Sequence, residues 1–190
     1  MWRAIPVLLL SLLLSACGPK PGQELTKQVL VSAHTARSGV SHLAMRYEEI
    51  LEPGGRGPGA PAPGWEEVAA FRSSAEARVA RELLSAYTTP VPVDPALERA
   101  RDIGELSVAT AELVKLALEP SGTWEGFAKE LQVRRSRLDR AMSALEAGTK
   151  SHVLIEARTE TNKKSSLYAD ALVRARASGA AGSGEAAPAR

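Results

Sequence analysis

The chain has 190 residues, a length typical of one domain with additional segments. Its 24 Lys and Arg residues nearly balance 22 Asp and Glu, so the bulk charge gives no sign of a nucleic-acid-binding protein. A single cysteine excludes an internal disulfide bond.

Residues 1–16 have the pattern of a secretory signal peptide. Arg3 makes the start positive, and an apolar run follows over residues 5–14. Ten helical residues cover about 15 Å, half of a hydrocarbon core of about 30 Å, which is too short for a stable membrane span. The small residues Ser15 and Ala16 then precede the cysteine.

The sequence Leu14-Ser15-Ala16-Cys17 resembles the lipobox of bacterial lipoproteins, in which a Leu and two small residues precede an obligatory Cys. The resemblance covers only the first seventeen residues. It implies that a peptidase recognises residues 14–16 and cuts before Cys17, which carries a diacylglycerol and a further acyl chain such as palmitate. Two or three acyl chains hold a protein firmly on a bilayer, whereas one binds marginally. The alternatives are an ordinary secretory signal with an incidental cysteine and an uncleaved apolar segment.

The residues after the cysteine predict where the protein lies. The sorting rules of lipoproteins associate Asp after the cysteine with the inner membrane, so Gly18 favours the outer membrane. Residues 17–23 would form the lipidated cysteine and a Pro/Gly-rich tether with a reach of about 20 Å. We therefore expect a lipid-anchored protein of the bacterial cell envelope that faces the periplasm.

Residues 24–177 are rich in Ala, Leu, Glu and Arg, and strand-like runs are absent after the first leucines. This composition predicts an all-α fold, an elongated antiparallel bundle of four to five helices. The first helix, 24–51, carries apolar residues at alternating steps of three and four, and Gly39 marks a kink or a close crossing. A Gly/Pro-rich loop, 52–64, follows and lacks the Gly-Lys-Ser/Thr sequence of a phosphate-binding loop.

A second helix is expected from Trp65 to about residue 86, where three prolines end it. Asp94 and Pro95 predict the N-cap and first position of the third helix. Thr123 is the expected N-cap of the fourth helix, which should pack against the third as a hairpin.

Gly148 is the expected C-cap of the fourth helix. A fifth helix, 151–177, has a polar middle at which it could break, or it could extend beyond the bundle. Residues 178–190 are small and polar, and they predict a disordered C-terminal tail.

The sequence offers little that points to catalysis or to a cofactor. His34 and His42 are eight residues apart and lie about 80° from alignment on a helix, while His152 opens the fifth helix. No HExxH zinc motif and no GxSxG nucleophile motif occur. We therefore expect no enzyme, no metal site and no cofactor.

The sharpest charge cluster is formed by Arg134, Arg135, Arg137 and Arg140 on the fourth helix. One interpretation is contact with an acidic partner or with anionic lipid head groups. The favoured alternative is a solvent-exposed face with intrahelical ion pairs. Arg134 falls on the apolar stripe and is expected to extend its stem along the edge of the core.

Trp65, Trp124 and Phe127 each lie in the first turns of a helix. They could line a ligand groove at one end of the bundle, or they could simply fill the end of an alanine-rich core, which is the favoured interpretation.

Three hypotheses on function follow. The first is a non-enzymatic helical module that binds an envelope protein or itself, and it predicts an exposed apolar or arginine-rich groove on the fourth and fifth helices. The second is a periplasmic carrier of a small ligand or lipid, which requires a continuous apolar cavity between helices. The third is an enzyme, in which a histidine meets an acid and a nucleophile in a cleft. No nucleic-acid partner is expected.

Overall fold

A computed structural model describes residues 20–51 and 64–182, and within these ranges every regular element is helical. This confirms the all-α fold. The predictions for Leu14, Ser15, Ala16 and Cys17, for most of the loop 52–64 and for residues 183–190 lie outside the described residues. The elements are α2 (Pro21–Leu51), η1 (Trp65–Val68), α3 (Ala69–Ser73), α4 (Ala75–Ser85), α5 (Ala100–Leu118), α6 (Trp124–Ala147) and α7 (Ser151–Gly182).

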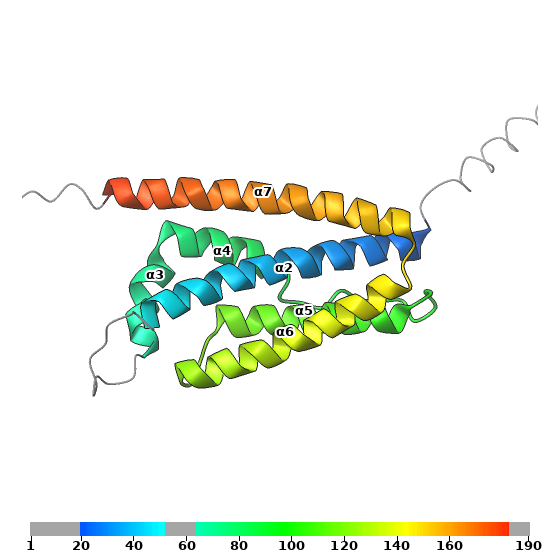
Figure 1. Ribbon diagram of the computed structural model, residues 1–190, viewed down its shortest axis with the longest axis horizontal. Helices are drawn as coiled ribbons and strands as arrows, with labels where there is room; N and C mark the ends of the chain where they lie inside the picture. The colour runs from blue at the N-terminus through cyan, green and yellow to red at the C-terminus, as the bar shows by residue number, and fades with distance from the viewer. Residues whose placement is uncertain (1–19, 52–63, 183–190) are drawn as a thin grey trace, which may run out of the picture.

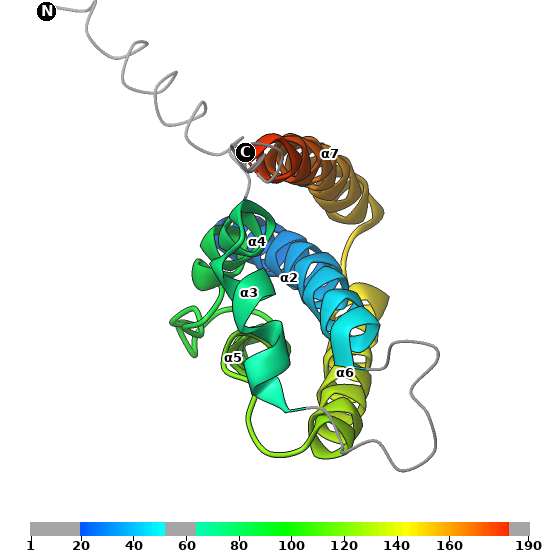
Figure 2. The same ribbon diagram turned by 90° about the vertical axis from the view of Figure 1, so that its left-hand side faces the viewer.

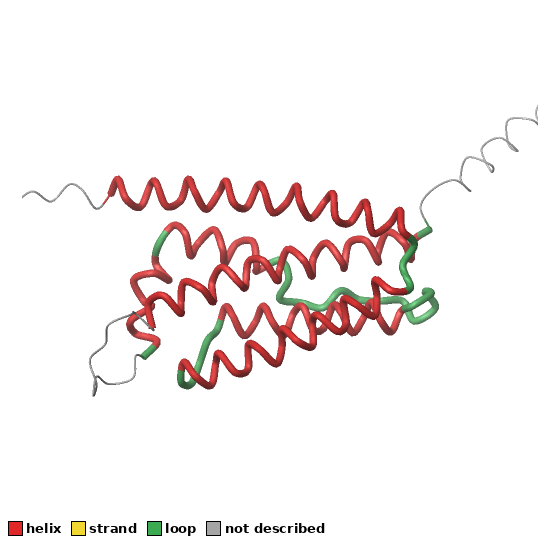
Figure 3. Tube along the Cα trace, viewed as in Figure 1, coloured by secondary structure: helices red, strands yellow, loops and turns green. Residues whose placement is uncertain are grey.

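The helices form the elongated antiparallel bundle that was expected. In Figure 1, α2, α5 and α7 run in one direction, while α4 and α6 run in the other. Figure 3 shows the long loop that connects α4 to α5 along the side of the bundle. Seen from the end in Figure 2, α2 lies between α4 and α7 on one side and α5 and α6 on the other. It packs against all four.

The central position of α2 explains its sequence. Between residues 29 and 36, six side chains are buried, so almost the whole circumference is covered there. Gly39 marks a close crossing, because a Cβ atom at this position would lie 2.9 Å from Cδ2 of Leu84 on α4. Leu84 is itself fully buried, which leaves its side chain little room to move.

The prediction of a single second helix is wrong in one respect, because this part of the chain is divided into η1, α3 and α4. The break falls at Ser74, whose backbone is extended (φ −69°, ψ 159°). Its Oγ accepts a hydrogen bond of 3.1 Å from the amide of Ala77. A serine in this role satisfies one of the free N–H groups of a helix start, so Ser74 ends one helix and caps the next.

The expected start of the third helix is also wrong. Asp94 accepts a hydrogen bond of 2.9 Å from the amide of Ala96, but this closes only a turn. Helix α5 begins at Ala100, after Arg99 in the left-handed conformation (φ 64°). Arg99 is the only non-glycine residue with positive φ in the described ranges, and this conformation separates the turn from the helix.

The boundaries of α6 are as predicted. Thr123 accepts a hydrogen bond of 3.1 Å from the amide of Gly126, and Gly148 follows the last residue of the helix. Helix α7 has no break in its polar middle and continues past the expected end at residue 177 to Gly182.

Aromatic side chains fill the end of the bundle where α2 finishes. The rings of Trp65 and Phe127 lie 5.1 Å apart, and the ring of Tyr47 lies 5.6 Å from that of Trp65, in edge-to-face arrangements. Tyr47 Oη donates to the carbonyl of Ala117 at 3.2 Å, and Trp65 Nε1 donates to the carbonyl of Gly122 at 2.9 Å. Since the rings contact one another and their polar atoms are satisfied, they act as core rather than as the lining of a groove.

Candidate functional site

Three helices meet at one buried carboxylate, that of Glu76 in the first turn of α4. Its side chain is only 9 % exposed. On α7, Arg176 donates to Oε1 of Glu76 from Nε at 2.9 Å and from Nη2 at 2.6 Å. On α2, His42 Nε2 lies 3.0 Å and Arg46 Nε 3.5 Å from the same oxygen. We call these four residues, together with Tyr168, the Glu76 cluster.

The helical spacing explains why these residues meet. His42 and Arg46 are four residues apart and share one face of α2. Tyr168 lies on the buried face of α7, and its ring meets that of His42 edge-on at 6.1 Å. Arg46 also lies over the ring of Phe71, 5.4 Å from its centroid.

The charges of the cluster follow from burial and neighbours. Burial raises the pKa of Glu76, but the hydrogen bond from Arg176 and the charge of Arg46 outweigh it, so the pKa is lowered and the carboxylate is ionised. Burial lowers the pKa of His42 despite the nearby Glu76, so this ring is neutral at neutral pH. Burial and the charge of Glu76 raise the pKa of Tyr168, which therefore keeps its proton.

Helices α2 and α7 also carry buried polar atoms outside this set of ion pairs. The buried hydroxyls of Thr35, Thr161 and Tyr168 have no hydrogen-bond partner within the described part of the chain. Buried ion pairs add little net stability, because desolvation offsets their attraction, but they specify which groups must meet. The Glu76 cluster therefore fixes the position of α7 more than it strengthens its attachment.

The outer side of α7 carries a face without charged residues. Two large aliphatic side chains on this face are more than half exposed, Ile155 at 64 % and Val173 at 66 %; a third, Leu167 at 58 %, lies about 120° away around the helix. Ile155 and Val173 are five helical turns apart and point the same way. Within about 40° of that direction lie only uncharged, exposed residues, and we call this set the uncharged stripe: Ile155, Thr159, Asn162, Ser166, Ala169, Val173 and Ala177.

The four arginines of α6 do not form one open cationic face. Arg134 pairs with Glu130 at 2.8 Å, and both Arg134 and Arg137 contact Glu112 of α5. The Arg134–Glu130 pair is intrahelical, as the ion-pair interpretation expects, whereas the contacts with Glu112 join α6 to α5.

Two further arginines of this group differ in their surroundings. Arg135 is half-buried and donates to Ser41 Oγ at 3.2 Å, and burial together with the charge of Arg37 lowers its pKa. Arg140 is exposed.

The histidines are the remaining groups with chemical potential. His34 Nε2 lies 3.2 Å from Oε1 of Glu146, His42 belongs to the Glu76 cluster, and His152 is exposed. Each of the first two meets an acid, but the structure gives neither of them a hydroxyl or thiol hydrogen-bond partner in the described ranges. In the same ranges, no group of three or more His, Cys, Asp or Glu residues is placed to hold a metal ion.

Sequence reasoning missed the Glu76 cluster. Glu76 and Arg176 are ordinary members of an Ala/Glu/Arg-rich chain. Their meeting depends on the packing of α4 against α7, which no local pattern reveals.

Comparison with models of known protein families, with curated proteins and with solved structures finds no match to this chain. Among the described helices, none combines the length and the hydropathy that crossing a bilayer requires.

Proposed function

We propose that the chain is a lipid-anchored protein of the bacterial envelope that faces the periplasm and acts without catalysis by binding a protein partner. The anchor is supported by the lipobox-like residues 14–17 and by the short apolar run before them. Gly18 favours the outer membrane over the inner membrane. The partner-binding role is supported by the outer face of α7.

The uncharged stripe is the observation that carries this role. Surface helices usually place charged residues opposite their buried face. Here that position holds only uncharged residues, with an exposed aliphatic side chain toward each end of the stripe. Small residues such as Ser166 and Ala169 let another helix approach closely, so the stripe suits an amphipathic helix of an envelope protein, or a second copy of this chain.

A photoreactive amino acid at Ser166 tests this role in the native envelope. We expect one defined adduct, which Val173→Glu abolishes because it places a charge in the stripe. Val133→Glu is the matched control, since Val133 is 55 % exposed but lies on α6. An adduct with the mass of two copies of this chain would identify the partner as itself. No adduct, or equal loss in both variants, contradicts partner binding through α7.

The anchor is tested separately by Cys17→Ser. We expect the variant to keep its leader or to leave the membrane fraction, which mass spectrometry and fractionation measure. Unchanged processing and unchanged membrane association would show that the lipobox interpretation is wrong.

A second candidate, the small-ligand or lipid carrier, is supported by one observation, although it is a partly charged cavity at the bundle end and not the continuous apolar cavity between helices that a carrier predicts. A cavity of about 330 Å³ lies at the end of the bundle where α2 begins.

A further inference from the structure

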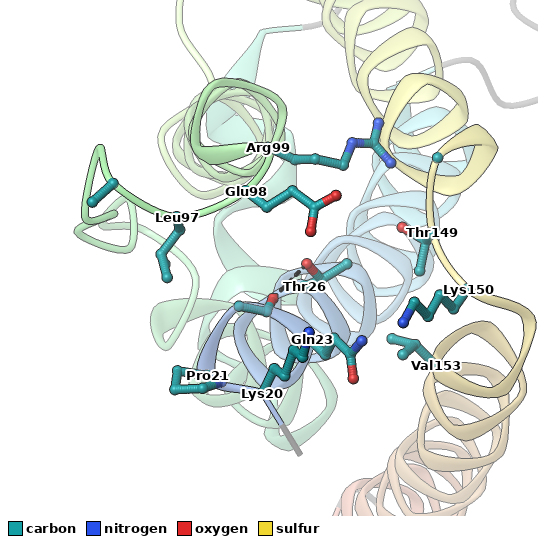
Figure 4. Close-up of a pocket in the computed structure, with 13 residues that line it drawn as sticks. Lys20, Pro21, Gln23, Thr26, Leu97, Glu98, Arg99, Thr149, Lys150 and Val153 are labelled. Carbon is teal, nitrogen blue, oxygen red and sulfur yellow. Dashed lines mark hydrogen bonds between the residues drawn. The ribbon is translucent and has the colours of Figure 1, made fainter. Parts of the chain in front are cut away.

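The cavity of about 330 Å³ is built by three segments that are distant in sequence. Figure 4 shows the start of α2, the segment that precedes α5 and the turn between α6 and α7 around it. It lies at the opposite end of the bundle from the aromatic rings around Tyr47. Its volume falls at the lower end of the range for small-molecule sites.

Arg99 holds two of these walls in place. Its guanidinium donates to the carbonyl of Leu145 at 2.6 Å, to the carbonyl of Ala144 and to Asp102 at 2.7 Å. It thus satisfies carbonyls at the end of α6, which have no partner within the helix. The rim hydroxyls are satisfied too, because Thr26 donates to Gly22 and Thr149 to Leu145.

Unlike Arg99 and the rim hydroxyls, three charged side chains of the cavity wall have no partner in the described part of the chain. Glu98, Lys20 and Lys150 make no ion pair and no side-chain hydrogen bond with the described part of the chain. The carboxylate of Glu98 comes from the segment before α5, whereas the ammonium groups come from the start of α2 and from the turn before α7. Figure 4 shows Glu98 and Lys150 both directed into the cavity. Opposite charges therefore face one cavity without neutralising each other.

We propose that this cavity binds a small zwitterion of the phosphoethanolamine type, a primary ammonium group joined to a phosphate by two carbons. Glu98 accepts hydrogen bonds from the ammonium group, and Lys20 and Lys150 donate to the phosphate oxygens. A phosphate suits two lysines better than a carboxylate does, because it offers more acceptor oxygens. Leu97 and Val153 supply apolar wall for the two carbons. The group has about eight non-hydrogen atoms, which such a cavity admits.

The same chemistry has two sources, a soluble phosphoethanolamine compound and the head group of a phospholipid. The proposed anchor favours the head group, because Lys20 follows Cys17 by three residues, a reach of about 10 Å. This preference rests on the proposed function, whereas the binding chemistry does not.

The test uses the full chain with Cys17→Ser, so that it does not depend on lipidation. Glycerophosphoethanolamine is titrated and followed by amide chemical shifts in two-dimensional NMR spectra. We expect a dissociation constant on the order of 1 mM for so small a ligand, with shifts confined to the cavity segments. Glycerophosphocholine, whose methylated nitrogen cannot donate a hydrogen bond, and glycerophosphoglycerol, which has no ammonium group, should bind about tenfold more weakly.

Variants test which residues bind the ammonium group of the ligand and which bind its phosphate. Glu98→Gln should weaken binding about tenfold and remove the preference over glycerophosphoglycerol, while Lys150→Gln should weaken all three compounds. Glu105→Gln, on the exposed side of α5, should change nothing. Equal affinity for the three compounds, or an unchanged preference in Glu98→Gln, overturns the proposal.

Flotation with vesicles identifies the source. Binding to phosphatidylethanolamine vesicles but not to phosphatidylcholine vesicles assigns the head group, and binding only to the soluble compound assigns a soluble ligand. Binding to neither overturns the proposal. Ligand binding as expected here, combined with unchanged processing and unchanged membrane association of Cys17→Ser in cells, would contradict only the anchor.

Discussion

Arg176 on α7 donates two hydrogen bonds, of 2.9 and 2.6 Å, to a single oxygen of Glu76 on α4. The two partners are unequal, because the side chain of Arg176 is 51 % exposed and that of Glu76 only 9 %. Loss of the arginine therefore leaves a buried carboxylate with only the more distant Arg46 and a neutral His42. The pair joins α7 to α4 by two hydrogen bonds.

Arg176→Ala should lower the free energy of unfolding by about 1–2 kcal/mol, a value below that of a fully buried pair because solvent screens the exposed arginine. We expect amide hydrogen exchange to quicken in α7 and to stay unchanged in α5 and α6, which hydrogen-exchange mass spectrometry resolves by segment. Arg174→Ala, an exposed neighbour, is the control. Equal protection of α7 in both variants would show that the pair does not hold the helix.

Stability should fall as the pH falls from 7 to 5. The pKa of His42 is lowered in the fold from its ordinary value of 6.5, so below 6.5 the unfolded chain binds the proton first. The pKa of Glu76 is lowered from 4.5, so its contribution is present above 4.5 and is lost at lower pH. Urea midpoints measured between pH 4 and 8 should therefore decrease toward acid.

The variant His42→Gln separates the contribution of His42 to the pH dependence of stability from that of Glu76. It should flatten the dependence between pH 7 and 5 while the decline below pH 4.5 remains, because Glu76 and its arginines are still present. His152→Gln, at an exposed position, should leave the whole profile as it is. A His42→Gln profile identical to that of the unmodified chain contradicts this assignment.

Gly39→Val should destabilise the bundle by about 1–3 kcal/mol, because the new side chain meets buried Leu84 where α2 crosses α4. Gly39→Ala should be closer to neutral, since the helix preference of alanine, about 1 kcal/mol over glycine, offsets part of the contact. Urea unfolding compares the two. A valine variant as stable as the alanine variant would show that the crossing can open.

Arg99→Ala and Arg99→Gly isolate the strain at this left-handed residue. Both lose the hydrogen bonds to the end of α6, but only alanine keeps the steric cost of φ 64°. We expect both variants to be less stable than the unmodified chain, and Arg99→Gly to be more stable than Arg99→Ala by about 1 kcal/mol in urea unfolding. The reverse order would mean that the start of α5 rearranges.

The sequence predicted those features of the fold that depend only on residues close by in the chain. The cap at Thr123 and the apolar stripe of α2 depend on neighbours within one or two helical turns, so the sequence reveals them. The break at Ser74 and the late start of α5 were missed, because a serine also occurs within helices without ending them and Asp94-Pro95 is equally good in a turn.

The candidate sites were harder to predict. The Glu76 cluster needs three helices at once, and Glu98, Lys20 and Lys150 come together only through the turn before α7. Apart from the two cluster residues on α2 and the two on α7, the members of each set come from different elements, so no helical spacing connects them. The four arginines of α6 did form a pattern with helical spacing, and three of them contact groups of this chain itself.

Helices α2 and α7 run parallel and begin at the same end of the bundle. The position of a residue along α7 therefore measures its axial distance from the end that carries the proposed anchor. At about 1.5 Å per residue, Ile155 lies about 6 Å and Val173 about 33 Å along the axis from the start of α7. A partner that contacts both must extend over about 27 Å along α7. The length of α7 would then set how far from the membrane surface such a partner is held.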